Sequence, residues 1–268
     1  MKLFPTVRPY WHVDAKWIFG ILFSLSLIAC LLLSVASVLT SKDRAPEIVA
    51  SVIGMNFIRD GSIDIKEAEK KIDQAGGAIH PIPYMQSVVI TKADLKLTPN
   101  EISLKVFLPL TKIIYDKGVE GAADQFTKTE KQREQFINQA SLLRLFTSST
   151  HLALQLPLTI FYILSVLFAA AVAYFSAGWG RLSNLGLLLF FISLPGTVFS
   201  LLLLNPPHDG KGSFSSLPPI LTHDIGSALG QYFVFVTWAG AIMLIAALVG
   251  KIVTTIRNRQ HKQTDKKN

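Results

Sequence analysis

Four long stretches without a charged residue constrain this chain more than any other feature of its sequence. A helix that crosses a bilayer needs about 20 predominantly apolar residues. Hydrophobic residues make up 50% of the chain and charged residues only 16%, a balance that soluble domains seldom show. The sequence therefore predicts an all-α membrane protein with four transmembrane helices. The four uncharged stretches are Trp17–Ser41, Leu145–Gly180, Leu182–Pro207 and Ile225–Gly250.

The order of these stretches predicts a four-transmembrane-helix bundle with a mainly helical extracytoplasmic domain inserted between helices 1 and 2. The apolar run from Trp17 is longer than the core of about 7–15 residues in a cleaved signal peptide. Although Ser34-Val35-Ala36 is a small-x-small site, we therefore expect an uncleaved anchor. The expected segments are a cytoplasmic lead at 1–16, transmembrane helices at 17–41, 146–177, 182–204 and 225–250, an extracytoplasmic helical domain at 42–145, an extracytoplasmic loop at 205–224, and an unstructured, basic cytoplasmic tail at 251–268.

Basic residues are distributed unevenly around the four stretches, and this distribution predicts the orientation. The short loop 205–224 contains only Lys211, whereas the opposite side carries many cations. Because basic residues favour the cytoplasmic side, both termini are predicted to be cytoplasmic in a multi-pass protein of the cell membrane. The asymmetry also accounts for the net charge of +8, so no nucleic acid is expected as a partner. The flanking cations are Lys2, Arg8, Lys16, Arg181, Lys251, Arg257, Arg259, Lys262, Lys266 and Lys267.

The chain has a single cysteine, Cys30, and it lies inside the first apolar stretch. The extracytoplasmic domain therefore has no disulfide and has to fold by packing alone. Tetraspanin-like and claudin-like proteins, whose outer loops are joined by cysteine pairs, fit this sequence poorly. A bacterial cytoplasmic membrane fits it better.

Apolar periodicity within 42–145 predicts short helices and one strand. Helical spacing of apolar residues indicates helices over Pro46–Ile58 and Asp64–Ala75, the second ending at Gly76-Gly77. The β-branched run Ser87–Thr91 indicates a short strand, although no partner for it is evident.

Two threonine-containing motifs predict helix starts in the second half of this domain. Thr98-Pro99-Asn100-Glu101 is a capping box that opens a helix to about Lys117, bent at Pro109. Thr127-Lys128-Thr129-Glu130 is a second expected box. Its helix carries an apolar stripe toward the second span, formed by Phe136, Ile137, Ala140, Leu143 and Phe146.

Polar residues share helix faces in the outer halves of three spans. Two explanations are open: a polar chamber that opens to the outer leaflet, or serine and threonine side chains that hydrogen-bond neighbouring helices. Pro157 and Pro195-Gly196 lie at a similar depth. The three faces comprise His151, Gln155, Thr159 and Tyr162 in the second span, Ser193, Thr197 and Ser200 in the third, and Asp224, Ser227 and Gln231 in the fourth.

Histidines near the predicted outer face define the candidate catalytic residues. His80, His151, His208 and His223 lie there, and His223 is followed by Asp224. A histidine beside a carboxylate can act as a general base, so His151, His223 and Asp224 are the catalytic candidates. Gln155, Tyr162 and Gln231 are the candidates for substrate binding. The histidine spacing matches no established metal motif and no cofactor fingerprint occurs, so neither is expected, and exposed histidines are most often inert.

Small residues spaced by four recur in the spans and allow helices to approach closely. Packing within the chain is the default explanation, and self-association or a partner subunit is the alternative. The small residues are Ser26, Cys30 and Ser34, then Ala169, Ala173 and Ala177, and finally Gly226 and Gly230.

Two functional hypotheses follow from this layout. In the first, the protein is a non-enzymatic envelope protein whose external domain binds a partner. In the second, it is a membrane-embedded enzyme that acts on lipid or lipoprotein at the outer leaflet. The layout resembles the membrane subunits of cell-division and lipoprotein-export ABC systems, and also the four-span lipoprotein intramolecular transacylase of Gram-positive bacteria. Transport is disfavoured because the inner halves of the spans carry no charged residue.

Overall fold

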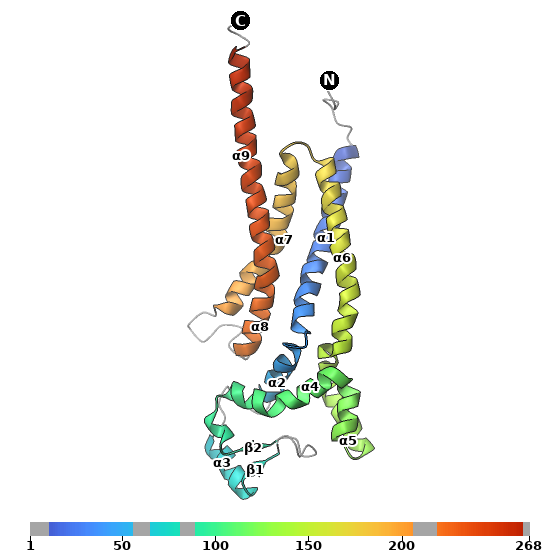
Figure 1. Cartoon of the computed structure of the whole chain (residues 1–268), viewed down its shortest axis with the longest axis vertical. Helices are drawn as coiled ribbons and strands as arrows, with labels where there is room; N and C mark the ends of the chain where they lie inside the picture. The colour runs from blue at the N-terminus through green and yellow to red at the C-terminus, as the bar shows by residue number, and fades with distance from the viewer. Residues whose placement is uncertain (1–10, 56–64, 81–88, 206–218, 265–268) are drawn as a thin grey trace. The chain divides into compact units, whose positions relative to one another are not determined.

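The computed structural model describes residues 11–55, 65–80, 89–205 and 219–264, and most of them are helical (Figure 1). Contacts divide the chain into two compact units. The spanning unit comprises Met1–Ser34, Pro157–Ser200 and Leu229–Asn268. The domain unit comprises Val35–Leu156 and Leu201–Ala228.

Among the described residues, four helices are long and apolar enough to cross a membrane. Three of them are regular: α1 (Trp11–Leu39), α6 (Ser148–Phe175) and α7 (Gly180–Leu204). The fourth consists of α8 (Pro219–Leu229), the π-helical turn η4 (Gly230–Val234) and α9 (Phe235–Thr264), which follow one another without a loop. Together the four helices have the length and composition of a multi-pass membrane protein.

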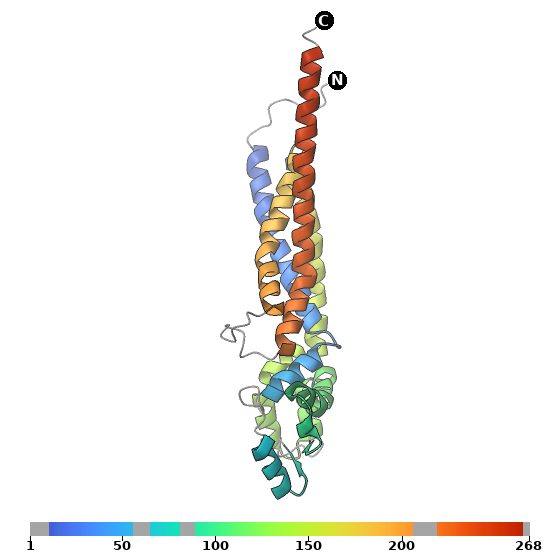
Figure 2. The same cartoon turned by 90° about the vertical axis from the view of Figure 1, so that its left-hand side faces the viewer.

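Two helices are longer than the sequence analysis predicted. α1 starts at Trp11, inside the predicted lead and two residues after Pro9, the last proline before the span. α9 continues to Thr264 as one unbroken helix in both views (Figure 2), so the expectation of an unstructured tail after Lys251 was wrong. The residues from Lys251 to Thr264 include no glycine or proline. Helix nucleation is the unfavourable step, and the span has already nucleated this helix. Each further residue therefore extends α9 at little cost in free energy.

In the spanning unit, α7 and α9 pack closely through glycines. A Cβ atom on Gly240 would lie 2.6 Å from the backbone nitrogen of Phe190 and 2.9 Å from the carbonyl oxygen of Gly186. A Cβ atom on Gly196 would lie 2.1 Å from the ring of Phe233 in η4. Glycine is therefore required wherever these backbones and rings meet.

Small residues also mark where α1 meets α6 within the spanning unit. The Ser165 hydroxyl donates to the Ser26 hydroxyl at 3.1 Å, and both side chains are buried. Cys30 and Ser34 follow Ser26 on the same face and are also buried. Packing within the chain thus accounts for the small-residue stripe of α1.

The domain unit contains the segment predicted to fold by packing alone. Its elements are α2 (Ala45–Met55), α3 (Ile65–Gln74), the strands β1 (Ala78–Ile79) and β2 (Ile90–Thr91), the 3₁₀ turn η2 (Asp94–Lys96), α4 (Pro99–Phe126), α5 (Glu130–Gln139) and the 3₁₀ segment η3 (Ser141–Phe146). α2 lies directly against α4: the Thr111 hydroxyl donates to the Pro46 carbonyl at 2.8 Å, and Gly54 leaves room for Ser103.

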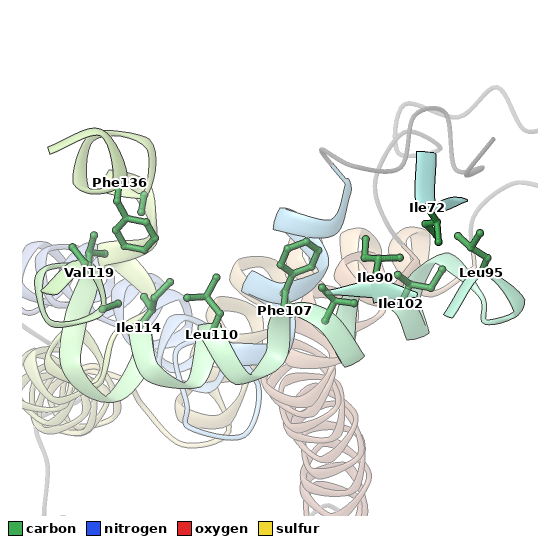
Figure 3. Packing of buried hydrophobic residues seen from close by; sticks show 14 residues of the cluster. Ile72, Ile90, Leu95, Ile102, Phe107, Leu110, Ile114, Val119 and Phe136 are labelled. Atoms are coloured by element: carbon green, nitrogen blue, oxygen red, sulfur yellow. The ribbon is translucent and has the colours of Figure 1, made fainter. Parts of the chain in front are cut away.

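The hydrophobic core of this domain follows one face of α4. Phe107, Leu110 and Ile114 point from that face, and Phe107 is only 1% exposed (Figure 3). One end of the core is closed by residues from α3, β2 and η2, and the other end by Phe136 of α5, which packs near Val119 (Figure 3). Burial of apolar side chains is the main favourable contribution to folding, so this cluster can hold the domain together without a disulfide.

The first capping box forms as predicted, whereas the second does not. Thr98 accepts from the Glu101 amide at 3.4 Å, and its own amide donates to the Glu101 carboxylate at 2.7 Å. α4 contains Pro109 and is interrupted at Gly118, which has a positive φ of 75°. Thr127 instead caps the end of α4 by donating to Ala123, and Thr129 is the N-cap of α5. The hydroxyl of Thr127 is thus already engaged by the preceding helix.

The partner that the sequence analysis could not find for the strand is Ala78–Ile79. β1 and β2 pair antiparallel, with Ile79 opposite Ile90, while Ser87 and Val88 lie outside the described residues. α3 ends at Gln74, and Gly76 and Gly77, which both have positive φ, then direct the chain into β1.

Asp94 stabilises the turn that follows β2. Burial alone would raise the pKa of Asp94, but hydrogen bonds from the Lys105 ammonium, the Thr91 amide and the Thr91 hydroxyl together hold the pKa of this carboxyl below its usual value. The carboxylate therefore stays charged at neutral pH, with its donors close by.

Candidate functional site

The structure places His151 and Gln155 in a polar cluster between the first turns of α6 and the last turns of α1. His151 Nδ1 lies 3.2 Å from the Thr40 hydroxyl, and His151 Nε2 lies 3.3 Å from the Gln155 side-chain nitrogen. The same Gln155 nitrogen donates to the Ser37 hydroxyl at 3.0 Å. Sequence reasoning placed His151 and Gln155 on one face, but it identified neither Ser37 nor Thr40.

Donors and acceptors in this cluster match when His151 is neutral with its hydrogen on Nδ1. The Thr40 hydroxyl donates to the Ala36 carbonyl at 2.8 Å, so it is available to accept from His151 Nδ1. The Gln155 amide has two hydrogens, one for Ser37 and one for His151 Nε2. Both ring nitrogens are thereby engaged. Proton abstraction by His151 would require the hydrogen bond from Gln155 to break.

A second polar cluster joins the start of α2 to α8 within the domain unit. Arg44 donates to the Ser227 hydroxyl at 3.2 Å, and that hydroxyl donates to the Asp224 carbonyl at 3.1 Å. Arg44 was not singled out by the sequence analysis. Its only signal was a cation placed directly after the first span, which is too common a feature to be specific.

His223 and Asp224 form a loose pair on α8. His223 Nδ1 and Asp224 Oδ1 lie 3.9 Å apart, and the His223 side chain is 72% exposed. This distance is within the range of an ion pair but too long for a hydrogen bond. A carboxylate that orients a catalytic histidine normally does so through a hydrogen bond, so the geometry of the pair does not resemble that of a catalytic dyad.

The predicted catalytic residues thus belong to two separately bonded clusters. The hydrogen bonds of His151 lead to Thr40 and to Gln155, whereas Ser227, which donates to the Asp224 carbonyl, accepts from Arg44. Tyr162 is half exposed on α6, and Gln231 is exposed in η4. The catalytic and substrate-binding assignments stay predictions.

Polar residues of the third span serve as interhelical hydrogen-bonding groups. The Thr237 hydroxyl of α9 lies 2.7 Å from the hydroxyls of both Ser193 and Thr197, and Ser193 is completely buried. These contacts favour the interhelical explanation over a polar chamber for this part of the chain. Thr237 itself was missed because a single threonine in an apolar span carries no distinctive pattern.

Metal binding has no support in the part of the chain that the structure describes. Within those residues, no group of three or more histidine, cysteine, aspartate or glutamate side chains could hold a metal ion. His80 is exposed at the end of β1, and His208 lies outside the described residues.

The fold defines the class: a multi-pass α-helical membrane protein whose four long helices accompany a separately packed helical domain. No protein-family model matches the chain, and no curated protein or solved structure is significantly similar to it. Its function therefore has to be inferred from the contacts of the molecule itself.

Proposed function

We propose that the protein is a scaffold of the cell envelope whose helical domain binds a partner protein outside the cytoplasm. The observation that carries this proposal is the separate hydrophobic core of residues 45–146, which gives the inserted segment a fold of its own. His151 and Gln155, at the start of α6, are engaged in hydrogen bonds with Thr40 and Ser37. A folded domain with a charged surface and a membrane anchor suits a binding role.

The segment η3 supports a position of this domain next to the bilayer. Leu142 and Leu145 are strongly exposed, and residues three apart lie on the same side of a 3₁₀ helix. Leu152 and Leu156 continue the exposed apolar surface along the first turns of α6. Such a surface is stable at the boundary between headgroups and acyl chains. Arg144, between the two leucines of η3, is paired with Glu120 of α4.

The orientation is part of the same proposal and rests on the basic residues. Arg181 follows α6, and Lys251, Arg257 and Arg259 lie on the last turns of α9. The positive-inside rule places these residues, and both termini, in the cytoplasm. The domain between α1 and α6 then lies outside.

Cysteine labelling tests this orientation. In a Cys30→Ser background, Lys112→Cys on the exposed side of α4 is expected to react with a membrane-impermeant maleimide on intact cells. Asn258→Cys on the exposed end of α9 is expected to react only after the membrane is permeabilised. Both positions are solvent-exposed, so a difference in labelling reports the side of the membrane. The reverse pattern, or labelling of both positions in intact cells, would contradict the proposed topology.

Partner binding can be examined by photo-crosslinking in living cells. A photoreactive amino acid would be placed at exposed positions of the domain, Lys112 and Lys117 on α4 and Lys131 and Glu134 on α5. We expect one discrete protein adduct from at least one of the two helices. Asn258 on α9 is the matched control and is expected to give no such adduct. If all domain positions fail to capture a protein, the partner-binding role is wrong.

The enzyme hypothesis is separated from the scaffold by substitutions on α8. We expect His223→Ala and Asp224→Asn to complement a deletion strain fully, because the two side chains form only a loose pair and His223 is 72% exposed. Loss of a general base would instead lower a reaction rate by roughly 10²- to 10⁴-fold. Failure to complement, with the protein present at its normal level in the membrane, would favour the membrane-embedded enzyme acting on lipid or lipoprotein.

A further inference from the structure

An apolar groove of about 550 Å³ lies on the face of α9 in the spanning unit. Trp179 forms one wall, and residues of α9 from Ile242 to Val253 form the remainder. Ile242, Ile245 and Val249 are more than half exposed along it. The volume lies within the range of about 300–1,000 Å³ that is usual for small-molecule sites.

The wall formed by Trp179 is fixed in place by two contacts with α9. The indole nitrogen donates to the Thr254 hydroxyl at 3.0 Å. Gly250 has no side chain, and a Cβ atom there would lie 2.4 Å from the indole ring. The ring therefore packs directly against the α9 backbone. The turn that carries it includes Gly178, whose φ is +48°.

Two arginines lie near the end of the groove at Val253. Arg257 follows Val253 by four residues and thus lies on the same face of α9, about 6 Å further along the axis. Arg181 comes two residues after Trp179 and is held by a hydrogen bond from its Nε to the Ser176 carbonyl at 3.2 Å. The groove is therefore apolar along its length and cationic at one end.

We propose that this groove binds an anionic glycerophospholipid, with one acyl chain along α9 and the phosphate between Arg257 and Arg181. Tryptophan is enriched at the level of the headgroups, which suits Trp179 at the junction of the two parts. Basic pockets between membrane helices commonly bind anionic headgroups. The site needs only that these helices span a bilayer, so it does not depend on the partner-binding role of the domain.

A second copy of the chain is the competing occupant of this face, and the charge of α9 argues against it. From Phe235 to Thr264 the helix contains basic residues and no acidic one. Two parallel copies joined through this face would bring Arg257 close to its equivalent without a compensating carboxylate. An anionic lipid neutralises the same charges.

Native mass spectrometry of the full chain tests this site, with phosphatidylglycerol and phosphatidylcholine as the probes. We expect the wild-type chain to bind one phosphatidylglycerol more tightly than any phosphatidylcholine. Each basic residue near a headgroup contributes about a fivefold gain in affinity, so Arg257→Gln is expected to weaken phosphatidylglycerol binding about fivefold. Arg259→Gln is the matched control, because it removes the same charge from the opposite side of α9.

Ala246→Phe fills the groove from a position that faces outward. It is expected to weaken both lipids, whereas Leu248→Phe, exposed on the same helix but outside the groove, is expected to leave them unchanged. Equal retention of the two lipids by the wild-type chain would overturn the proposal. So would a dimer peak that Ala246→Phe abolishes without changing lipid binding, since the groove would then be an interface between copies.

Discussion

A chain carrying Phe107→Ala is expected to lose the fold of the domain while its membrane helices stay intact. Phe107 is 1% exposed and lies midway along the core face of α4. Removing a buried phenyl ring costs about 3–5 kcal/mol, because the ring leaves a cavity as well as its transfer free energy. That loss is comparable with the whole stability of many small domains.

Hydrogen exchange of the detergent-solubilised chain measures this effect by segment. We expect amides of α4 and α5 to lose protection in Phe107→Ala, while those of α7 and α9 exchange as in the wild type. Lys112→Ala, one turn along α4 on its exposed side, serves as the control and should change nothing. If α4 keeps its protection, or if every helix loses protection equally, the domain does not depend on this core as a separate unit.

A Gly240→Ala chain is expected to melt at a lower temperature than the wild type because α7 and α9 can no longer approach. The added Cβ atom would lie 2.6 Å from the Phe190 nitrogen and 2.9 Å from the Gly186 oxygen, and both of these are backbone atoms. A side-chain rotation cannot relieve such a clash. The helices must separate, which costs about 2 kcal/mol or more and weakens the hydrogen bonds of Thr237.

Gly180→Ala is the matched control for this substitution. It adds the same methyl group near the start of α7, where a Cβ atom would meet nothing within 4 Å. Because alanine favours helix over glycine by about 1 kcal/mol, the melting temperature of Gly180→Ala in detergent should stay the same or rise. Equal changes in the two variants would show that the crossing at Gly240 is not tightly packed.

The sequence predicted the elements whose signals are local. Apolar stretches identified the four long helices, because the length of a span is set by the bilayer and can be counted in residues. The capping box at Thr98 was also predictable, since cap geometry involves residues only three apart, whereas the predicted helix end near Lys117 was too early because α4 continues past Gly118 to Phe126. The same local signal failed at Thr127, where the end of one helix competes with the start of the next.

Local signals could not show which polar side chains meet. His151 was a candidate general base, and the sequence left open whether it meets His223 and Asp224; its hydrogen bonds are to Thr40, which follows α1, and to Gln155. The contact of Arg44 with Ser227 joins residues far apart in the chain. Helical periodicity states which face a residue occupies, but it does not identify the helix that covers that face.

Sequence alone determined that the chain has four apolar helices and that the segment between the first two must fold without a disulfide. Hydropathy and the number of cysteines can both be counted along the chain, so neither depends on which residues meet in the fold. Only the tertiary structure decided that a short β-pairing closes the domain, that glycines set the crossing of α7 and α9, and that Trp179 packs on Gly250 to make a groove. Each of these depends on distances between residues that are remote in the chain, and such distances result from the packing of the whole fold.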